Sequence, residues 1–536
     1  MSARPWRRRA RRAVQAAARR ARSLPEPAPR LLRSVLSALP QDVEAVRRMR
    51  AVAAPPPRRP AHAARPAPSA RPTASGSYGG YLHLADVGET YSPREAATLL
   101  QLESAVLKRH LFAEPLPPLP PTGHEAEDEA AAAERVAAYL RRADAAGEDG
   151  APAHLVLVGV YPTLENPYGN GFVHRRVKYF QAAGVRVHVA VVDPAAEPHV
   201  YEYDGVTVLV GRGPEAAELL RTRAYASVGA HFLGRTLWEP VKDALAGHRF
   251  FAFMHGYESR RWIRTVRNHR TQGQIDDAIE DTLVRQRFWR EVLAHPNCPE
   301  RFVFVSRWWR RAAQEDMELV FPGQRSAIVH NVIDTDLFRH VPKDPEQRFR
   351  VLWVRSAANL NYGPDLAVKA LQRLRDTPLW ERTTVTVIGD GKHFGLFEQA
   401  FAEDANVTVE RRYAVQEEIA ALHREHGIFL VPTRLDSQGV SRDEAMSSGL
   451  VPVTNDAAAV REFVDADCAV LAGFEDVAGL ADGLRRLMED PELFLRMSEA
   501  AARRVRAQTS PEHTVEREMA LMGLVPARTD RTEGTA

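Results

Sequence analysis

Cysteine is nearly absent from this 536-residue chain: only Cys298 and Cys468 occur, far apart and without the spacing of a metal site. This scarcity excludes a disulfide framework and fits a reducing compartment. No apolar run reaches the roughly 18 residues that suggest a membrane span. No apolar segment follows the basic N-terminus, so we expect no secretory signal. The Walker pattern of P-loop nucleotide hydrolases is also missing. We therefore expect a cytoplasmic protein.

Acidic residues are scarce at one end of the chain. Residues 1–72 hold 18 Arg, no Lys and three acids, a net charge of +15, and subtracting this from the total of +3 leaves −12 for the rest. Residues 1–75 are rich in Arg, Ala and Pro, which bury too little apolar surface to offset the entropy of ordering, so we expect a disordered tail. It could be a peripheral tether to an anionic membrane or have no function. Nucleic-acid binding is not expected, because interleaved aromatic residues are missing.

The rest of the chain predicts an α/β protein. Over 76–150 we expect a helical accessory region, with helices at 92–112 and 125–146. From residue 153 short apolar strands alternate with helices of about 10 to 15 residues, which indicates βαβ units and a parallel sheet. The pattern restarts after residue 336 with six strands. We expect two doubly wound Rossmann-like domains facing across a cleft, over 151–335 and 336–508, followed by a C-terminal helix and loose tail over 509–536.

The segment DSQGVSRDEAMSSGLVPVTN (436–455) concentrates the candidate chemistry. It follows the apolar strand GIFLVPT, and ligands bind such sheets at the carboxyl ends of strands. Gly439 permits close approach of backbone to a ligand, the helix after it favours a phosphate, and the carboxylates of Asp436 and Glu444 suit a vicinal diol. A second interpretation needs no ligand, because Ser441 and Glu444 match a capping box. Spacing alone leaves both interpretations open.

The same segment resembles the donor-site signature of the family-four retaining glycosyltransferases (glycosyl transferases group 1), an acid and a glutamate before Ala-Met-x-x-Gly-x-Pro-Val. RFVFVSRWWRR, HNVIDTDLF and VIGDGKHF match further family segments in the same order, so the resemblance spans roughly residues 153–508. It implies the GT-B fold and transfer of a sugar from a nucleotide-sugar to a glycan or lipid-linked acceptor. The expected setting is cell-surface polysaccharide biosynthesis at the inner face of the membrane, without a metal or other cofactor.

The resemblance also implies roles for individual residues. Glu444 would hold the ribose hydroxyls of the donor, and Asp436 would hold hydroxyls of the donor sugar. His255, at the end of a strand, would contact the reacting sugar, so His255 and Asp436 are the candidate catalytic residues. No protein nucleophile is expected, because the family is thought to use front-face attack assisted by the donor's phosphate. The other donor-binding candidates are Gly439, Val440, Gly169, Gly171, Gly391, Arg355 and Lys392.

Two departures from the family pattern bear on activity. Asp436 stands where many members have Glu, which shortens the reach to the sugar. The usual lysine of the second domain is missing, and Asn361 and Tyr362 occupy its neighbourhood. Arg355 is then the expected cation for the diphosphate, with Lys392 in reserve. The alternatives are a nucleotide-sugar epimerase on the same scaffold and a catalytically degenerate, membrane-tethered partner.

Two short acidic motifs resemble the metal-binding Asp-x-Asp of another glycosyltransferase fold. They lie at 334–336 and 465–467. We interpret the first as part of the domain crossover and the second as a turn, so no metal site is expected at either.

The tether interpretation predicts that deleting residues 1–75 weakens binding to anionic liposomes. Each basic residue near an anionic leaflet contributes about 1 kcal/mol, and salt screens this attraction. The full chain should therefore sediment with such liposomes at low salt and less at high salt. Equal sedimentation of the truncated and full chains would exclude the tether.

Overall fold

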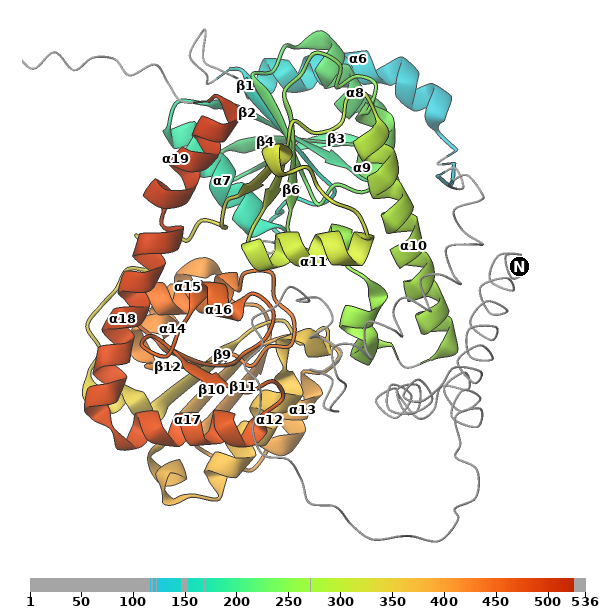
Figure 1. Cartoon of the computed structure of the whole chain (residues 1–536). Coiled ribbons are helices and arrows are strands. Elements are labelled where there is room, and N and C mark those ends of the chain that lie inside the picture. Colours follow the sequence, from blue (N-terminus) through green and yellow to red (C-terminus); the bar gives the residue numbers. More distant parts are fainter. Residues whose placement is uncertain are drawn as a thin grey trace, which may run out of the picture. The chain divides into compact units, whose positions relative to one another are not determined.

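The computed structural model describes residues 116, 119–121, 123–145, 153–166, 169–269 and 271–524 (Figure 1). The tail over 1–75 and the helix expected at 92–112 lie outside these residues. The second expected accessory helix is present as α6 (Glu125–Ala143), ending slightly earlier than predicted. The chain packs as two compact units, and residues 118–259, 288–310 and 319–536 form the one that carries both sheets.

The N-terminal domain is built on an eight-stranded sheet in the order β3-β4-β2-β1-β5-β6-β7-β8. Its strands are β1 (Ala153–Val158), β2 (Arg186–Val192), β3 (His199–Tyr203), β4 (Val206–Gly211), β5 (Ser227–His231), β6 (Phe250–Met254), β7 (Arg301–Phe304) and β8 (Ser326–Ile328). The helices among them are α7 (Gly171–Ala182), α8 (Pro214–Thr222), α9 (Arg235–Val241), α10 (Gln272–Ala294) and α11 (Arg307–Met317).

Strand β3 corrects the expectation of a wholly parallel sheet. It pairs antiparallel with β4 across a tight hairpin. The turn residues Asp204 and Gly205 have φ angles of 46° and 71°. Positive φ at both central positions is typical of a type I′ turn, for which Asp-Gly is a preferred sequence. The Asp-Gly pair between two strand-like runs was therefore a hairpin signal that our prediction missed.

The C-terminal domain has a six-stranded sheet in the order β11-β10-β9-β12-β13-β14, with every pair parallel. The six predicted strands are all present: β9 (Arg350–Val354), β10 (Thr384–Gly389), β11 (Val407–Arg411), β12 (Ile428–Leu430), β13 (Val451–Asn455) and β14 (Val470–Ala472). The helices are α12 (Pro364–Arg375), α13 (Gly395–Ala400), α14 (Gln416–Glu425), α15 (Val440–Ser447), α16 (Val460–Phe463), α17 (Val477–Glu489), α18 (Pro491–Thr509) and α19 (Pro511–Met522).

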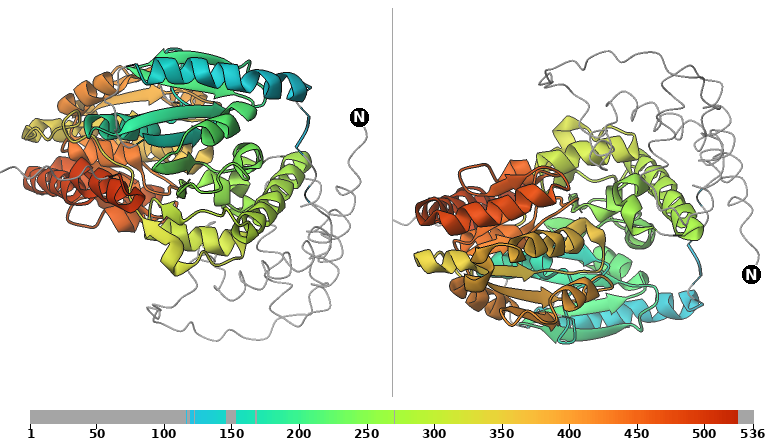
Figure 2. Two further views of the ribbon diagram at one scale, coloured as in Figure 1. Left: turned by 90° about the horizontal axis from the view of Figure 1, so that it is seen from above. Right: turned by 90° about the horizontal axis from the view of Figure 1, so that it is seen from below.

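The central strands of each sheet are buried on both faces, which explains why they are continuous apolar runs. In the N-terminal domain Val156, Val189 and Phe251 are at most 1% exposed, and in the C-terminal domain Val351 and Trp353 are equally buried. Full burial of such a side chain contributes about 1.5–3 kcal/mol each. Helix α6 packs against α8 and β4, along the outside of the N-terminal sheet (Figure 2).

The last two helices connect the two domains. Helix α18 packs on α15 in the C-terminal domain, and α19 packs on α7 in the N-terminal domain (Figure 1). Val515, Met519 and Met522 of α19 join the core of the N-terminal domain. Behind them Arg176 of α7 donates from Nε to Glu518 Oε2 at 3.0 Å, with both side chains 2% exposed.

The second compact unit includes residues 260–287 and 311–318 among those described. Asp316 organises it: its Oδ2 accepts from Arg264 Nε at 2.6 Å and from the backbone N–H of Arg261 at 2.9 Å. Gln286 donates to the Asp316 carbonyl at 2.8 Å. These hydrogen bonds therefore hold the segment before α10, and α10 itself at Gln286, to the end of α11 within this unit.

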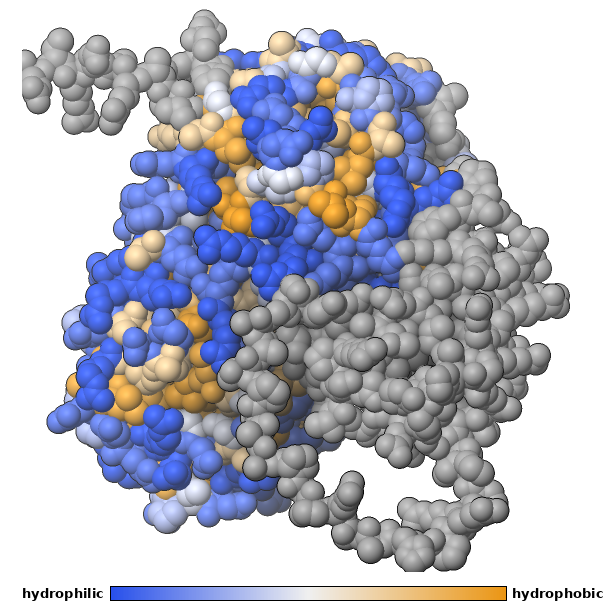
Figure 3. Space-filling model, in the orientation of Figure 1, coloured by the Kyte–Doolittle hydropathy of each residue, from blue (hydrophilic) through white to orange (hydrophobic). Residues whose placement is uncertain are grey.

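None of the helices in the described ranges is both long and apolar enough to cross a membrane. Hydrophilic residues cover much of the face in Figure 3 and separate its apolar areas.

We predict that Arg176→Met lowers the free energy of unfolding by about 3–5 kcal/mol, because it leaves the Glu518 carboxylate buried without a counter-charge. Adding Glu518→Leu should recover much of this loss. Arg485→Ala removes a half-exposed ion pair with Glu489 and should cost below about 1 kcal/mol. Urea unfolding checks all four proteins, and equal losses for Arg176→Met and Arg485→Ala would contradict the prediction.

Candidate functional site

The site lies where the strand order reverses. Leaving out the antiparallel β3, the parallel strands of the N-terminal sheet run third, second, first, fourth, fifth, sixth, seventh in chain order, and those of the C-terminal sheet run third, second, first, fourth, fifth, sixth. The reversal therefore falls between β1 and β5 and between β9 and β12. Ligands bind doubly wound sheets at the carboxyl ends of such strands. The predicted site residues occupy these ends: Gly169 and Gly171 follow β1, His255 follows β6, Arg355 follows β9, Gly391 and Lys392 follow β10, and Asp436, Gly439, Val440 and Glu444 follow β12.

Helix α15 begins directly after Gly439, whose φ of 103° favours glycine. A Cβ at this position would lie 2.9 Å from the Arg442 guanidinium, so a larger residue would be strained. Val440 is the first helical residue. Ser441 is already inside the helix, and its hydroxyl has no hydrogen-bond partner in the described part of the chain. The capping-box interpretation of Ser441 and Glu444 is therefore wrong, because neither side chain caps this helix.

Glu444 instead pairs with an arginine of the other domain. Arg175 Nη1 donates to Glu444 Oε1 at 3.1 Å, and its Nη2 donates to Gln416 Oε1 at 2.5 Å. The side chain of Glu444 is 6% exposed and that of Arg175 is 12% exposed. Burial raises the pKa of Glu444, and the adjacent Arg175 charge lowers it. Our sequence analysis missed Arg175, although it lies one helical turn after Gly171, on the same helix face.

Asp436 also pairs with a guanidinium. Arg355 Nη2 donates to Asp436 Oδ2 at 2.5 Å, and the two side chains are 10% and 13% exposed. The Arg355 guanidinium lies 4.2 Å from the centre of the Tyr362 ring, in the neighbourhood of the missing lysine. Arg355 is thus held between a carboxylate and an aromatic ring at the carboxyl end of β9, close to the candidate sugar-binding acid.

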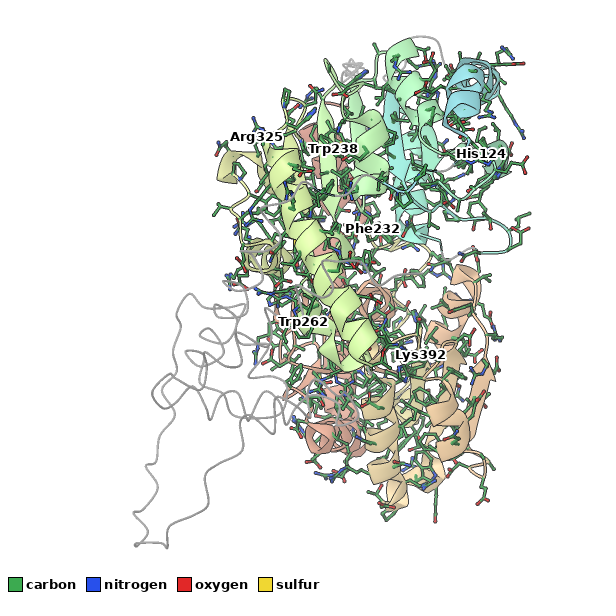
Figure 4. All side chains as sticks on the ribbon, turned by 90° about the vertical axis from the view of Figure 1, so that its right-hand side faces the viewer. His124, Phe232, Trp238, Trp262, Arg325 and Lys392 are labelled. Atoms are coloured by element: carbon green, nitrogen blue, oxygen red, sulfur yellow. The ribbon has the colours of Figure 1, made fainter. Side chains whose placement is uncertain are left out.

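The loop after β10 is shaped by close backbone contact. A Cβ on Gly391, whose φ is 132°, would lie 2.3 Å from the Ala358 backbone nitrogen, so only glycine fits beside the loop that follows Arg355. Lys392 is exposed (Figure 4), and among the described residues it makes no ion pair. The structure therefore brings Arg355, and not Lys392, next to Asp436.

Gln438 ties the loop between Asp436 and Gly439, the candidate donor loop, to the crossover between the domains at Asn331. Its side-chain amide donates to the Asn331 carbonyl at 3.0 Å and accepts from the Asn331 N–H at 2.6 Å. It also donates to Asp443 Oδ2 at 3.1 Å, and Asp443 pairs with Arg442 at 2.7 Å. All four side chains are buried, so the loop between Asp436 and Gly439 has a fixed backbone.

The acidic pair at 334–336 serves a turn. Asp334 Oδ1 accepts from the backbone N–H groups of Asp336 and Leu337 at 3.2 and 2.9 Å, as expected for a crossover segment. Across the residues that the structure describes, no three His, Cys, Asp or Glu side chains gather as metal ligands would.

His255 is buried directly after β6. Its Nε2 is 2.9 Å from His231 Nδ1, and its ring centre is 4.9 Å from Phe172 and 4.6 Å from Phe232. Phe232, labelled in Figure 4, has a φ of 57°. A bulky residue in this region costs about 1–3 kcal/mol, and such strain clusters at functional sites. His255 Nδ1 is buried and finds no partner among the described atoms.

The loop after β1 presents open space. Asn170, and not a glycine, has the left-handed conformation there, with a φ of 60°. A Cβ on Gly169 would touch Val160 at 3.1 Å, whereas a Cβ on Gly171 would meet nothing within 4 Å. No described protein atom requires a glycine at Gly171, which suits close approach by a ligand. On the other side, a Cβ on Gly256 would lie 3.6 Å from the Ser437 side chain, so the His255 and Asp436 loops are neighbours.

Parts of this chain are similar to known proteins. Residues 334–504 match the family model described as glycosyl transferases group 1. The MMP alpha-(1->4)-mannosyltransferase of Mycolicibacterium hassiacum is 27% identical in an alignment of 246 residues, and the match covers 39% of this chain and 59% of that protein. The chain thus matches about three fifths of the length of this curated relative.

Solved structures show the same fold. The sucrose-phosphate synthase of Thermosynechococcus elongatus superimposes with a TM-score of 0.52 at 15% identity, over 69% of this chain and 98% of that one. Anabaena Alr3699/HepE, solved with UDP and glucose, gives 0.52 at 13% identity over the same shares. The chain therefore has the GT-B fold that the sequence resemblance implied.

We predict that the His255 ring stays neutral as the pH falls from 8 to about 5.5, because burial and the nearby Arg176 charge hold its pKa well below the ordinary value. Its contact with His231 also needs one donating and one accepting nitrogen. NMR of histidine-labelled protein, with His255→Gln to assign the signal, should show no titration in this range. A midpoint near pH 6.5 would contradict the prediction.

Proposed function

We propose that this chain, whose residues 334–504 form a glycosyl transferases group 1 domain in a GT-B fold, is a retaining glycosyltransferase of family four. It moves a sugar from a nucleotide-sugar to a glycan or lipid-linked acceptor. We place the reaction in cell-surface polysaccharide or glycolipid biosynthesis at the inner face of the membrane, and we expect no metal or other cofactor.

The observation that carries the proposal is the pair of low-exposure carboxylates on either side of the Gly439 turn. A buried carboxylate without a structural role in its own helix is costly, and Glu444 caps nothing. Two hydroxyls of a ribose can donate to such a group, and the start of α15 favours the diphosphate that follows the ribose. Asp436 would then bind hydroxyls of the donor sugar.

Arg355 takes the role of the missing lysine in this proposal. The leaving nucleoside diphosphate gains negative charge as the glycosidic bond breaks, and preorganised cations and amide groups stabilise it. Asp436 and Tyr362 hold the Arg355 guanidinium in place before the donor arrives. This observation argues against the degenerate alternative, for which the missing lysine was the main support.

His255 would act as a neutral hydrogen-bonding group on the reacting sugar. Its Nδ1 has no hydrogen-bond partner among the described atoms, and the next residue, Gly256, lies close to Ser437 in the loop that carries Asp436. The acceptor hydroxyl would attack the sugar's anomeric carbon on the same face as the departing phosphate. An oxygen of that phosphate would take the hydroxyl's proton. No side chain is assigned as a nucleophile.

A thermal-shift screen of nucleotide-sugars tests the proposal. The relative's mannosyl transfer and the UDP and glucose of the Anabaena complex make GDP-mannose and UDP-glucose the first donors to try. A donor at 100 times its Kd should stabilise the wild type by about 2.7 kcal/mol. Glu444→Ala should lose about 2 kcal/mol of binding, roughly a thirtyfold rise in Kd.

The matched control is Glu489→Ala, which removes an exposed carboxylate of the same domain and should bind the donor as the wild type does. The active donor is then assayed with and without acceptor and chelator. Donor turnover that needs the acceptor and survives the chelator supports a metal-independent transferase, whereas sugar conversion without acceptor indicates the epimerase. Equal donor binding by Glu444→Ala and the wild type would refute the assignment.

A further inference from the structure

The counter-charge of Glu444 comes from the domain that the donor-site signature does not include. Arg175 stands on α7 of the N-terminal domain, and Glu444 stands on α15 of the C-terminal domain. The guanidinium is fixed by a second acceptor, Gln416 Oε1 of α14, and lies 6.0 Å from the centre of the Phe338 ring. Three segments of the C-terminal half of the chain therefore position this one side chain.

The position of Arg175 matters because the donor is an anion. The proposed ribose site places a carboxylate that is 6% exposed near a diphosphate. A buried charge that loses its partner either costs several kcal/mol or takes up a proton. A protonated Glu444 could accept fewer hydrogen bonds from the ribose, and an ionised Glu444 without a partner would repel the diphosphate. Arg175 meets both requirements, and its one hydrogen bond to Glu444 goes to Oε1, which leaves Oε2 as the acceptor for ribose hydroxyls in this proposal.

We propose that Arg175 is a positioning residue for the nucleotide: it holds the Glu444 carboxylate ionised and oriented for the ribose. The donor site then needs both domains, because its key acid depends on a cation from the other sheet. This inference rests on the proposed function, since it assumes that Glu444 receives the pentose.

The sign of the pH effect follows from the groups around Glu444. Besides Arg175, the charged groups that face it are Asp443 on its own helix and Asp334 in the crossover, and both raise its pKa together with burial. Arg175 is the group that opposes them. Without Arg175 the pKa of Glu444 rises further. Nucleotide binding needs the ionised carboxylate, so on acidification the Arg175 variant should lose its affinity at a higher pH than the wild type does.

The test measures UDP and GDP binding to the full chain by calorimetry from pH 5.5 to 8.5. Whichever nucleotide binds the wild type should bind Arg175→Gln at least about tenfold more weakly at pH 7, with the acid limb of the affinity profile moved to higher pH. Arg175→Lys keeps the charge and should restore the wild-type pH profile. Lys178→Gln, which removes an exposed cation from the same helix, should match the wild type.

A double-substitution cycle separates positioning from damage to the fold. In a Glu444→Gln background there is no carboxylate to keep ionised, so adding Arg175→Gln should change the Kd by less than about twofold. In the donor-consumption assay Arg175→Gln should raise KM for the donor more than it lowers kcat.

Two results would overturn the inference. One is binding by Arg175→Gln that equals or exceeds that of the wild type at every pH. The other is that Arg175→Gln weakens nucleotide binding equally in the wild-type and the Glu444→Gln backgrounds. If neither nucleotide nor any nucleotide-sugar binds the wild type, the proposed function itself fails, and this outcome is distinct from both.

Discussion

The structure depends on the pairing of its buried carboxylates with arginine side chains. Glu444, Asp436, Asp443 and Glu518 are all largely buried, and each is met by one arginine at hydrogen-bonding distance. Such pairs add little stability over an apolar core, but breaking one is costly. Two of these ion pairs use neighbouring arginines of α7, Arg175 with Glu444 and Arg176 with Glu518. The first half of α7 therefore links both α15 and α19 to the N-terminal domain.

The same constraint connects fold and chemistry. Both sheets follow the strand order that reverses beside the first strand, and parallel strands end with free backbone groups and loops at the reversal. The chain places its acids, glycines and arginines there. The Gln438 side chain then fixes its loop to the crossover through two hydrogen bonds to the Asn331 backbone. The proposed sugar transfer would need groups that are in place before charge develops, and the contacts of Gln438 would hold the loop in that way.

The sequence predicted the architecture well because the determinants are local. Apolar runs such as HLVLV and RVLWV mark strands buried on both faces, and their alternation with helices determines the fold class. The missed β3 is an edge strand, half exposed and short of apolar residues, so the run-based criterion passed over it. The capping box failed because Gly439 starts the helix two residues before Ser441, and a spacing pattern cannot show which residue is first in a helix.

By itself the sequence determined the two α/β domains, the turn at Gly439 and the acids that flank it, since each follows from residue type and spacing along the chain. Only the tertiary structure decided which cation meets which acid. Arg355 and not Lys392 reaches Asp436, and Arg175, 269 positions before Glu444, neutralises it. Such pairings form across strands and domains that are distant in the chain, and the physical reason they escape sequence reasoning is that burial, which selects them, exists only after the sheets have folded and packed.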